Sequence, residues 1–143
     1  MRYFVMTAAA ATLTTLVLVG EASAVQDTPV TINGVEAVCT GVGSAKDNPA
    51  WKDYPVKVVV ATSGGADLAN AHISLSQGGK EVAGLDCDAP WVLFRTPAGR
   101  YTATATLIGG SGRSHSTNFS TSGSGAQKEI TITFPRPTQP TAQ

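Results

Sequence analysis

Few residues of this chain belong to the types that carry out chemistry, and their spacing forms no catalytic pattern. The two histidines are His72 and His115, and no H-E-x-x-H zinc sequence is present. A metal site would need Asp86 or Asp88, but two alternating aspartates at a strand end are more often a solvated edge and a turn cap. No serine lies in a G-x-S-x-G sequence. We therefore expect no enzyme, no metal site and no cofactor, and we keep a metal-dependent hydrolase as the least favoured alternative.

Aromatic side chains are the better candidates for a binding surface. Trp51 and Tyr54 fall in an expected loop, and loop aromatics stack on sugar rings or anchor a protein partner. The favoured interpretation of the two rings is nevertheless a hydrophobic plug over one end of the fold, since a small core needs lids. Trp91 is expected to pack against a disulfide, and Arg95 and Arg100 are expected to be solvated.

Residues 1–24 have the pattern of a cleavable export signal. Arg2 supplies the positive charge, residues 4–19 form an apolar, threonine-rich run, and Ala22-Ser23-Ala24 provides the small-residue cleavage site. An uncleaved membrane anchor is the alternative, but the run is short for a membrane span and is interrupted by threonines. We expect a mature chain that begins at Val25 and is periplasmic or secreted.

Export would place the two cysteines in an oxidising compartment. Cys39 and Cys87 are the only cysteines, and in an exported protein such a pair predicts a disulfide. Closing a loop of this length stabilises a fold by about 4 kcal/mol in the chain-entropy model. Two unrelated buried thiols are the alternative.

Charge excludes one class of partner. The chain carries ten basic and ten acidic residues, and loss of residues 1–24 removes one of each, Arg2 and Glu21. A neutral chain without a basic run lacks the electrostatic footprint of a nucleic-acid-binding protein.

The elements that must position these residues are almost all strands. In residues 72–77, Ile73 and Leu75 alternate with His72, Ser74 and Ser76, which we expect to point outward. The other expected strands are 28–33, 35–40, 55–62, 80–85, 91–95, 100–107, 114–120 and 128–134. Short strands at this spacing, joined by glycine-, serine- and proline-rich turns, predict a single antiparallel, immunoglobulin-like β-sandwich of about seven or eight strands over residues 25–134.

Two segments depart from the strand pattern. Asn48 followed by Pro49 predicts a single helical turn that ends before Pro55. Residues 135–143 are rich in proline, which donates no backbone hydrogen bond, and we expect an extended, disordered tail.

The segment Thr96-Pro97-Ala98-Gly99-Arg100-Tyr101 carries a family resemblance. Pro97 stiffens the turn, Gly99 relieves its conformational strain, and Tyr101 returns its ring to the core while its hydroxyl seeks a partner. This P-x-G-x-Y turn resembles that of the carboxypeptidase regulatory-like domains, a transthyretin-like β-sandwich group of exported bacterial proteins. Residues 65–73 and 87–91 extend the resemblance, which spans residues 35–107.

The resemblance implies a non-catalytic module with a transthyretin-like fold. One enzyme group with this fold, the hydroxyisourate hydrolases, ends in a tyrosine-arginine-glycine-serine sequence, whereas the last expected strand here ends in Thr133-Phe134-Pro135. We expect an interaction or accessory module whose partner is an envelope or extracellular protein, or a glycan. The alternative is a carbohydrate-binding module that uses Trp51 and Tyr54.

Overall fold

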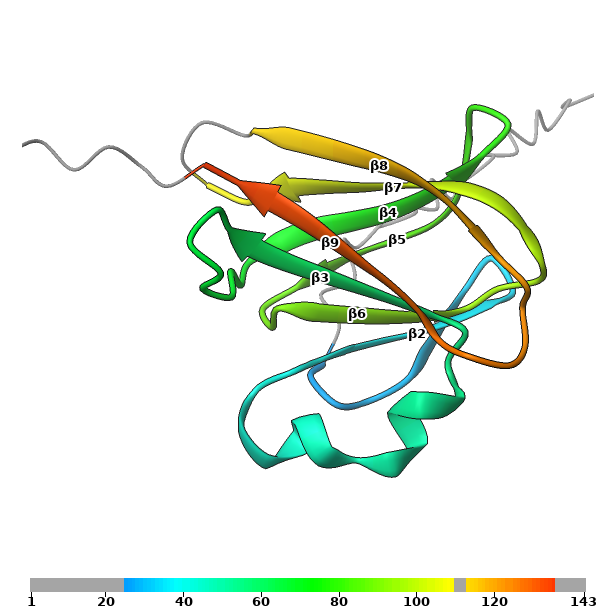
Figure 1. Ribbon diagram of the computed structural model, residues 1–143, viewed down its shortest axis with the longest axis horizontal. Coiled ribbons are helices and arrows are strands. Elements are labelled where there is room, and N and C mark those ends of the chain that lie inside the picture. Colours follow the sequence, from blue (N-terminus) through cyan, green and yellow to red (C-terminus); the bar gives the residue numbers. More distant parts are fainter. Residues whose placement is uncertain (1–24, 110–112, 136–143) are drawn as a thin grey trace, which may run out of the picture.

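The computed structural model of this protein describes residues 25–109 and 113–135, which form a two-layer β-sandwich (Figure 1). The expected export signal and all but the first residue of the expected proline-rich tail lie outside the described residues. The described strands are β1 (Val30–Ile32), β2 (Val35–Thr40), β3 (Val56–Thr62), β4 (Ala71–Gln77), β5 (Lys80–Cys87), β6 (Trp91–Arg95), β7 (Gly99–Leu107), β8 (Ser114–Thr121) and β9 (Lys128–Phe134). Two short 3₁₀ helices, η1 (Gly43–Asp47) and η2 (Pro49–Asp53), precede β3.

The strands form two sheets. The first has the order β1-β2-β6-β3-β9 and the second the order β5-β4-β7-β8. The predicted sandwich is confirmed, with nine strands in the described residues. One pairing differs from the antiparallel expectation, because β9 runs parallel to β3. The chain reaches β9 from β8, the edge strand of the other sheet, and therefore crosses between the layers before it joins β3.

The core lies between the sheets and follows the alternation in the sequence. Val56, Val58 and Val60 of β3 are buried inside, as are Ile73 and Leu75 of β4. Successive side chains of a strand point to opposite faces, so one buried face fixes the register of each strand. The outward direction predicted for the polar residues of β4 is confirmed, since these residues alternate with its buried ones.

The predicted disulfide is confirmed. Cys39 of β2 and Cys87 of β5 are bonded, with their Cα atoms 5.6 Å apart. These strands belong to different sheets, so the bond joins the two layers through the core. It closes a loop of 48 residues, which favours the folded state mainly by restricting the unfolded chain.

The predicted helical turn is present as η2. The Asn48 side chain accepts a hydrogen bond from the Ala50 amide (3.0 Å), and Pro49 occupies the first position, where its missing amide hydrogen costs nothing. Together η1 and η2 form a lid over the outer face of the first sheet, seen below β6 and β2 in Figure 1. In the described part of the chain, no helix is long and apolar enough to span a membrane.

Candidate binding surface

The lid buries both aromatic residues that were candidates for a binding surface. Trp51 is 7% exposed and Tyr54 is 3% exposed, and they pack with Val38 of β2 and Leu93 of β6 in a second, smaller core. The Trp51 indole Nε1 donates a hydrogen bond to the Ala45 carbonyl oxygen (2.8 Å), which ties η2 to η1. The structure therefore matches the plug interpretation and places neither ring on an open surface.

The hydroxyl of Tyr54 is held at the rim of the lid. It donates a hydrogen bond to Glu36 Oε1 (2.5 Å). The Arg95 guanidinium lies over the Tyr54 ring, with Cζ 4.6 Å from the ring centroid. Arg95 also donates to the Asp53 carbonyl oxygen (3.1 Å), so it is half-exposed but engaged, which refines the expectation that it is solvated. Burial, together with the hydrogen bond to the Glu36 carboxylate, raises the pKa of Tyr54 to about 12.

The expectation that Trp91 packs against the disulfide is wrong. The core side of β6 carries Val92 and Phe94, so Trp91 points to the outer face of the first sheet. Gly41 lies against the indole on the β2 side, and Lys57 Nζ lies 3.4 Å from the ring centroid on the β3 side. The ring is therefore fixed between two neighbours and is not an open stacking platform.

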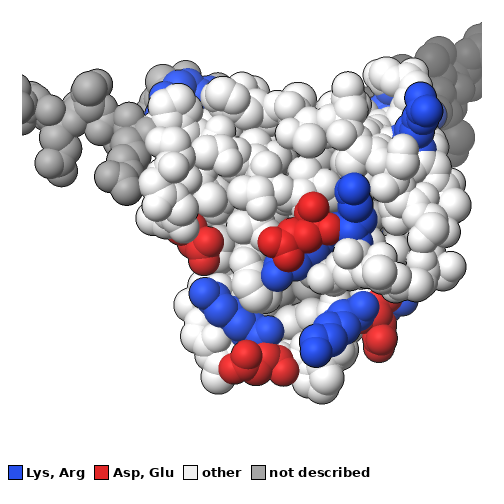
Figure 2. Space-filling model, viewed as in Figure 1, with Lys and Arg blue, Asp and Glu red and all other residues white. Residues whose placement is uncertain are grey.

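A cleft of about 240 Å³ lies beside Trp91, between the lid and β3. Two of its lysines already have acidic partners: Lys57 lies 3.6 Å from Glu129, and Lys46 lies 3.5 Å from Asp67. Basic and acidic side chains are interspersed in this part of the molecule, the lower half of Figure 2. Such a mixed surface offers little net attraction to an anion.

The turn of residues 96–101 has the structural role that its sequence implies. The Tyr101 hydroxyl donates a hydrogen bond to the Pro97 carbonyl oxygen (2.9 Å), and its ring stacks on Phe119 with centroids 5.8 Å apart. Pro97, Gly99 and Tyr101 thus fix the entry into β7, and Tyr101 also lines the pocket described below.

The outer face of the second sheet is different, because a regular grid of polar side chains covers it. Cross-strand register aligns β4, β7 and β8 so that their outward residues fall in three rows. We call this grid the hydroxyl face. Its rows are Ser76–Thr102–Asn118, Ser74–Thr104–Ser116 and His72–Thr106–Ser114.

Each row contains a hydrogen bond between β7 and β8. Thr102 donates to Asn118 Oδ1 (2.7 Å), the Thr104 and Ser116 hydroxyls are 2.8 Å apart, and the Thr106 and Ser114 hydroxyls are 2.6 Å apart. Cross-strand pairs of this kind hold side chains in fixed positions on a sheet. All three bonds lie at the exposed surface, so the remaining lone pairs and amide hydrogens are presented to solvent.

One end of the hydroxyl face is held by ionisable side chains. His72 Nδ1 lies 2.7 Å from Asp86 Oδ1 on β5, and His72 Nε2 lies 3.8 Å from Glu81 Oε1. The two carboxylates thus approach opposite nitrogens of the ring, which is not the convergent arrangement of metal ligands. Within residues 25–109 and 113–135, no group of three histidine, cysteine or acidic residues could hold a metal ion, and Asp88 is exposed in the turn after β5.

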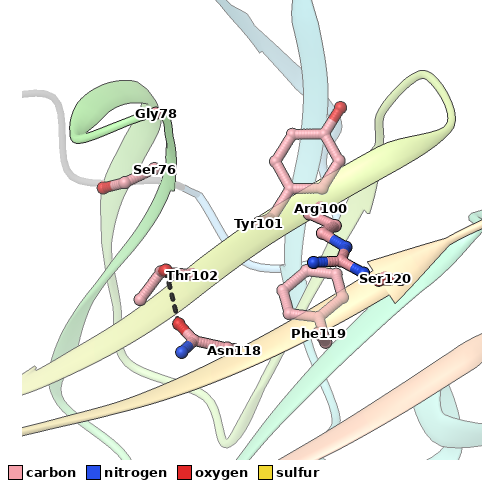
Figure 3. Close-up of a pocket in the computed structure, with 8 residues that line it drawn as sticks. All are labelled: Ser76, Gly78, Arg100, Tyr101, Thr102, Asn118, Phe119 and Ser120. Carbon is pink, nitrogen blue, oxygen red and sulfur yellow. Dashed lines mark hydrogen bonds between the residues drawn. The ribbon is translucent and has the colours of Figure 1, made fainter.

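A shallow pocket of about 360 Å³ occupies the other end. Its lining includes Ser76, Thr102, Asn118, Ser120 and Arg100. Figure 3 shows the Arg100 side chain reaching toward Ser120 on β8, beside the Thr102–Asn118 hydrogen bond. Arg100 is exposed, as expected.

Sequence reasoning missed the hydroxyl face as a site, although its pattern is visible. Thr102-Ala103-Thr104-Ala105-Thr106 alternates hydroxyls with alanines over one strand. Only the pairing of β7 with both β4 and β8 turns this line into a grid.

No family model matches the chain, and no curated protein matches it. Among solved structures, the chain is similar to the 5-hydroxyisourate hydrolase of Klebsiella pneumoniae, with 18% identity and a TM-score of 0.38. The similarity covers 56% of this chain and 83% of that one. At this identity and TM-score it says nothing about activity, so the chemistry of the surface rests on its own residues.

Proposed function

We propose that this protein is an exported, non-catalytic binding module that recognises a glycan through the hydroxyl face. The observation that carries the proposal is the grid itself, three hydrogen-bonded rows on a sheet face that none of the described residues covers, whereas the lid covers the other sheet. Periplasmic or secreted localisation belongs to the proposal. It is supported by the export pattern of residues 1–24 and by the disulfide, which persists in oxidising compartments.

The chemistry of the hydroxyl face favours a glycan over a protein partner. Protein interfaces are dominated by buried aromatic residues and arginines at their centre, and the nine positions of the grid contain neither. Hydroxyl and amide groups both donate and accept hydrogen bonds, as do sugar hydroxyls. Each contact with a sugar is weak, but a polymer repeats the contact and gains affinity through multivalency.

The residues to which we assign glycan binding therefore differ from those expected from the sequence. In the sequence it depended on stacking by Trp51 and Tyr54, and these rings are packed in the lid. The grid provides hydrogen bonding in place of stacking. Two observations support the non-catalytic part of the proposal: the carbonyl-bonded tyrosine turn that resembles carboxypeptidase regulatory-like domains, and the engagement of His72 by two carboxylates.

Removal of the central row tests the proposal. The double variant Thr104→Val, Ser116→Ala deletes one hydroxyl pair without adding charge or much volume. The matched control is Thr131→Val, an exposed threonine on β9 of the other sheet. Binding is measured by retardation in native gels that contain soluble polysaccharides, neutral and acidic.

We expect the wild-type protein and the Thr131→Val variant to be retarded equally by at least one polysaccharide, and the double variant to be retarded clearly less. Retardation by none of the polysaccharides would contradict the proposal. Equal weakening by the double variant and the control would contradict the choice of face.

A further inference from the structure

The pocket at one end of the hydroxyl face has a single charged residue. Of the described residues that line it, Arg100 alone carries a charge. Figure 3 shows around it the polar residues Ser76, Thr102, Asn118 and Ser120, together with Gly78 and the aromatic residues Tyr101 and Phe119. The pocket thus combines one positive charge with several neutral hydrogen-bond donors.

The charge of Arg100 is not satisfied within the described residues. The ion pairs and histidine–carboxylate contacts found there engage Arg95, Lys46, Lys57 and His72, and Arg100 takes part in none of them. Glu81, an acid of β5, which is separated from β7 by β4, is directed to His72, with Oε1 3.8 Å from Nε2. Arg100 contrasts with Arg95, whose guanidinium is committed to Glu36, Tyr54 and the Asp53 carbonyl.

The pocket is continuous with the grid. Thr102 and Asn118 belong to both the pocket and the grid. The next outward position on β8 is Ser120, which pairs with Arg100 on β7. A ligand that follows the rows therefore meets a guanidinium at the end of them. The planar guanidinium presents paired N–H donors that match the two oxygens of a carboxylate.

We infer that the pocket is a carboxylate subsite and that the ligand of the hydroxyl face is an acidic polysaccharide, with Arg100 binding a uronate carboxylate while the rows bind sugar hydroxyls. The inference rests on the proposed function and specifies its ligand. The Asn118 amide and the Ser120 hydroxyl donate to the same carboxylate or to its ring neighbours. Exposure of the pocket leaves the contact sensitive to ionic strength.

Two polymers with one backbone test the inference. Polygalacturonate carries a carboxylate on each sugar, and its methyl ester carries none. The variant Arg100→Gln keeps hydrogen-bond donors but removes the charge. Arg113→Gln is the control, since it removes the same charge from the exposed residue just before β8.

Loss of one charge-assisted contact predicts about tenfold weaker binding of Arg100→Gln to polygalacturonate, with binding to the methyl ester unchanged. Arg113→Gln should bind both polymers as the wild type does, and added salt should weaken the wild type more than Arg100→Gln. Equal losses in the two arginine variants would overturn the inference, because net charge alone would then explain the binding. Unchanged binding of Arg100→Gln would overturn it as well.

Different results would contradict the hydroxyl face as the binding surface and the pocket as a carboxylate subsite. If the double variant Thr104→Val, Ser116→Ala loses binding while Arg100→Gln does not, the hydroxyl face remains the binding surface and the carboxylate subsite is wrong. If wild-type protein binds neither polymer nor any other polysaccharide, both proposals are wrong. If the wild type instead self-associates and Arg100→Gln abolishes this, a second copy of the chain occupies the pocket and the glycan assignment is overturned.

Discussion

The two outer faces of this sandwich differ in whether other residues cover them, and the side chains of their strands explain the difference. On the first sheet, β6 directs Trp91, Leu93 and Arg95 outward, and the lid covers Leu93. On the second sheet, β7 directs Thr102, Thr104 and Thr106 outward, and no described residue covers them. A strand that is apolar on both sides needs cover on both sides, whereas an alternating strand is stable with one side in water. The covered face therefore contributes to stability, and the bare face is the one to which we assign binding in the proposed function.

The largest difference between the faces should appear when Trp51 is truncated. Trp51→Ala removes the centre of the lid and leaves a cavity against Val38 and Leu93, so we expect a loss of about 3–5 kcal/mol in the free energy of unfolding. Urea denaturation measures this loss. Trp51→Phe is the control that retains most of the buried volume, and it should lose less. A loss below about 1 kcal/mol for Trp51→Ala would show that the lid contributes little.

A second substitution tests how tightly the covered face is packed. Gly41 has a φ of +108°, and a Cβ atom there would lie 2.6 Å from Trp91 Cγ. Gly41→Ala should therefore cost about 1–3 kcal/mol, from backbone strain and from displacement of the indole. Gly34→Ala is the matched control, with a φ of +81° and no atom within 4 Å of the added Cβ. Equal losses of stability in the two variants would mean that the Trp91 contact adds nothing.

The lid should also respond to alkaline pH, whereas the grid should not. The pKa of Tyr54 is raised from 10.0 to about 12, so the folded state holds this proton more tightly than the unfolded chain. The resulting stability is complete below pH 10 and is lost as the pH rises from 10 to about 12. Unfolding midpoints of wild type and Tyr54→Phe across this range measure the effect. The advantage of the wild type should shrink with rising pH, and a constant difference would contradict the assigned cause.

The smallest effect on stability should come from the bare face. Thr104→Val removes an exposed hydrogen bond to Ser116 but keeps a β-branched side chain that suits a strand, so the free energy of unfolding should change by less than about 1 kcal/mol. Differential scanning calorimetry measures the change. A loss as large as that of Trp51→Ala would show that the grid is a structural element and would remove the contrast between the faces.

The sequence predicts the sandwich well because most strands alternate. Ile73 and Leu75 fix which side of β4 is buried, and the confirmed disulfide follows from two cysteines and an export pattern. Trp91 could not be placed in the same way. Residues 91–94 are all apolar, so the sequence does not show which side of this strand faces the core. The structure shows that Val92 and Phe94 face it.

The surfaces were harder to predict than the strands because they depend on distant residues. The partners that bury Trp51 are Val38 and Leu93, more than ten positions away on either side in the sequence. The rows of the hydroxyl face join three strands, and their alignment requires the register of β7 with β4 and with β8. Local patterns specify a strand and its faces, whereas tertiary pairing decides which face is covered and which is ordered into a grid.

Backbone amide chemical shifts, mapped while a short polygalacturonate oligomer is added, distinguish binding at the bare face from binding at the covered face. We expect shift changes that cluster on β4, β7 and β8, at Ser74, Thr104 and Ser116 and their neighbours, with none in η1, η2 or β6. Shift changes that cluster around the lid and Trp91, with the hydroxyl face unchanged, would show that the covered face is the binding surface and that the proposed function is wrong.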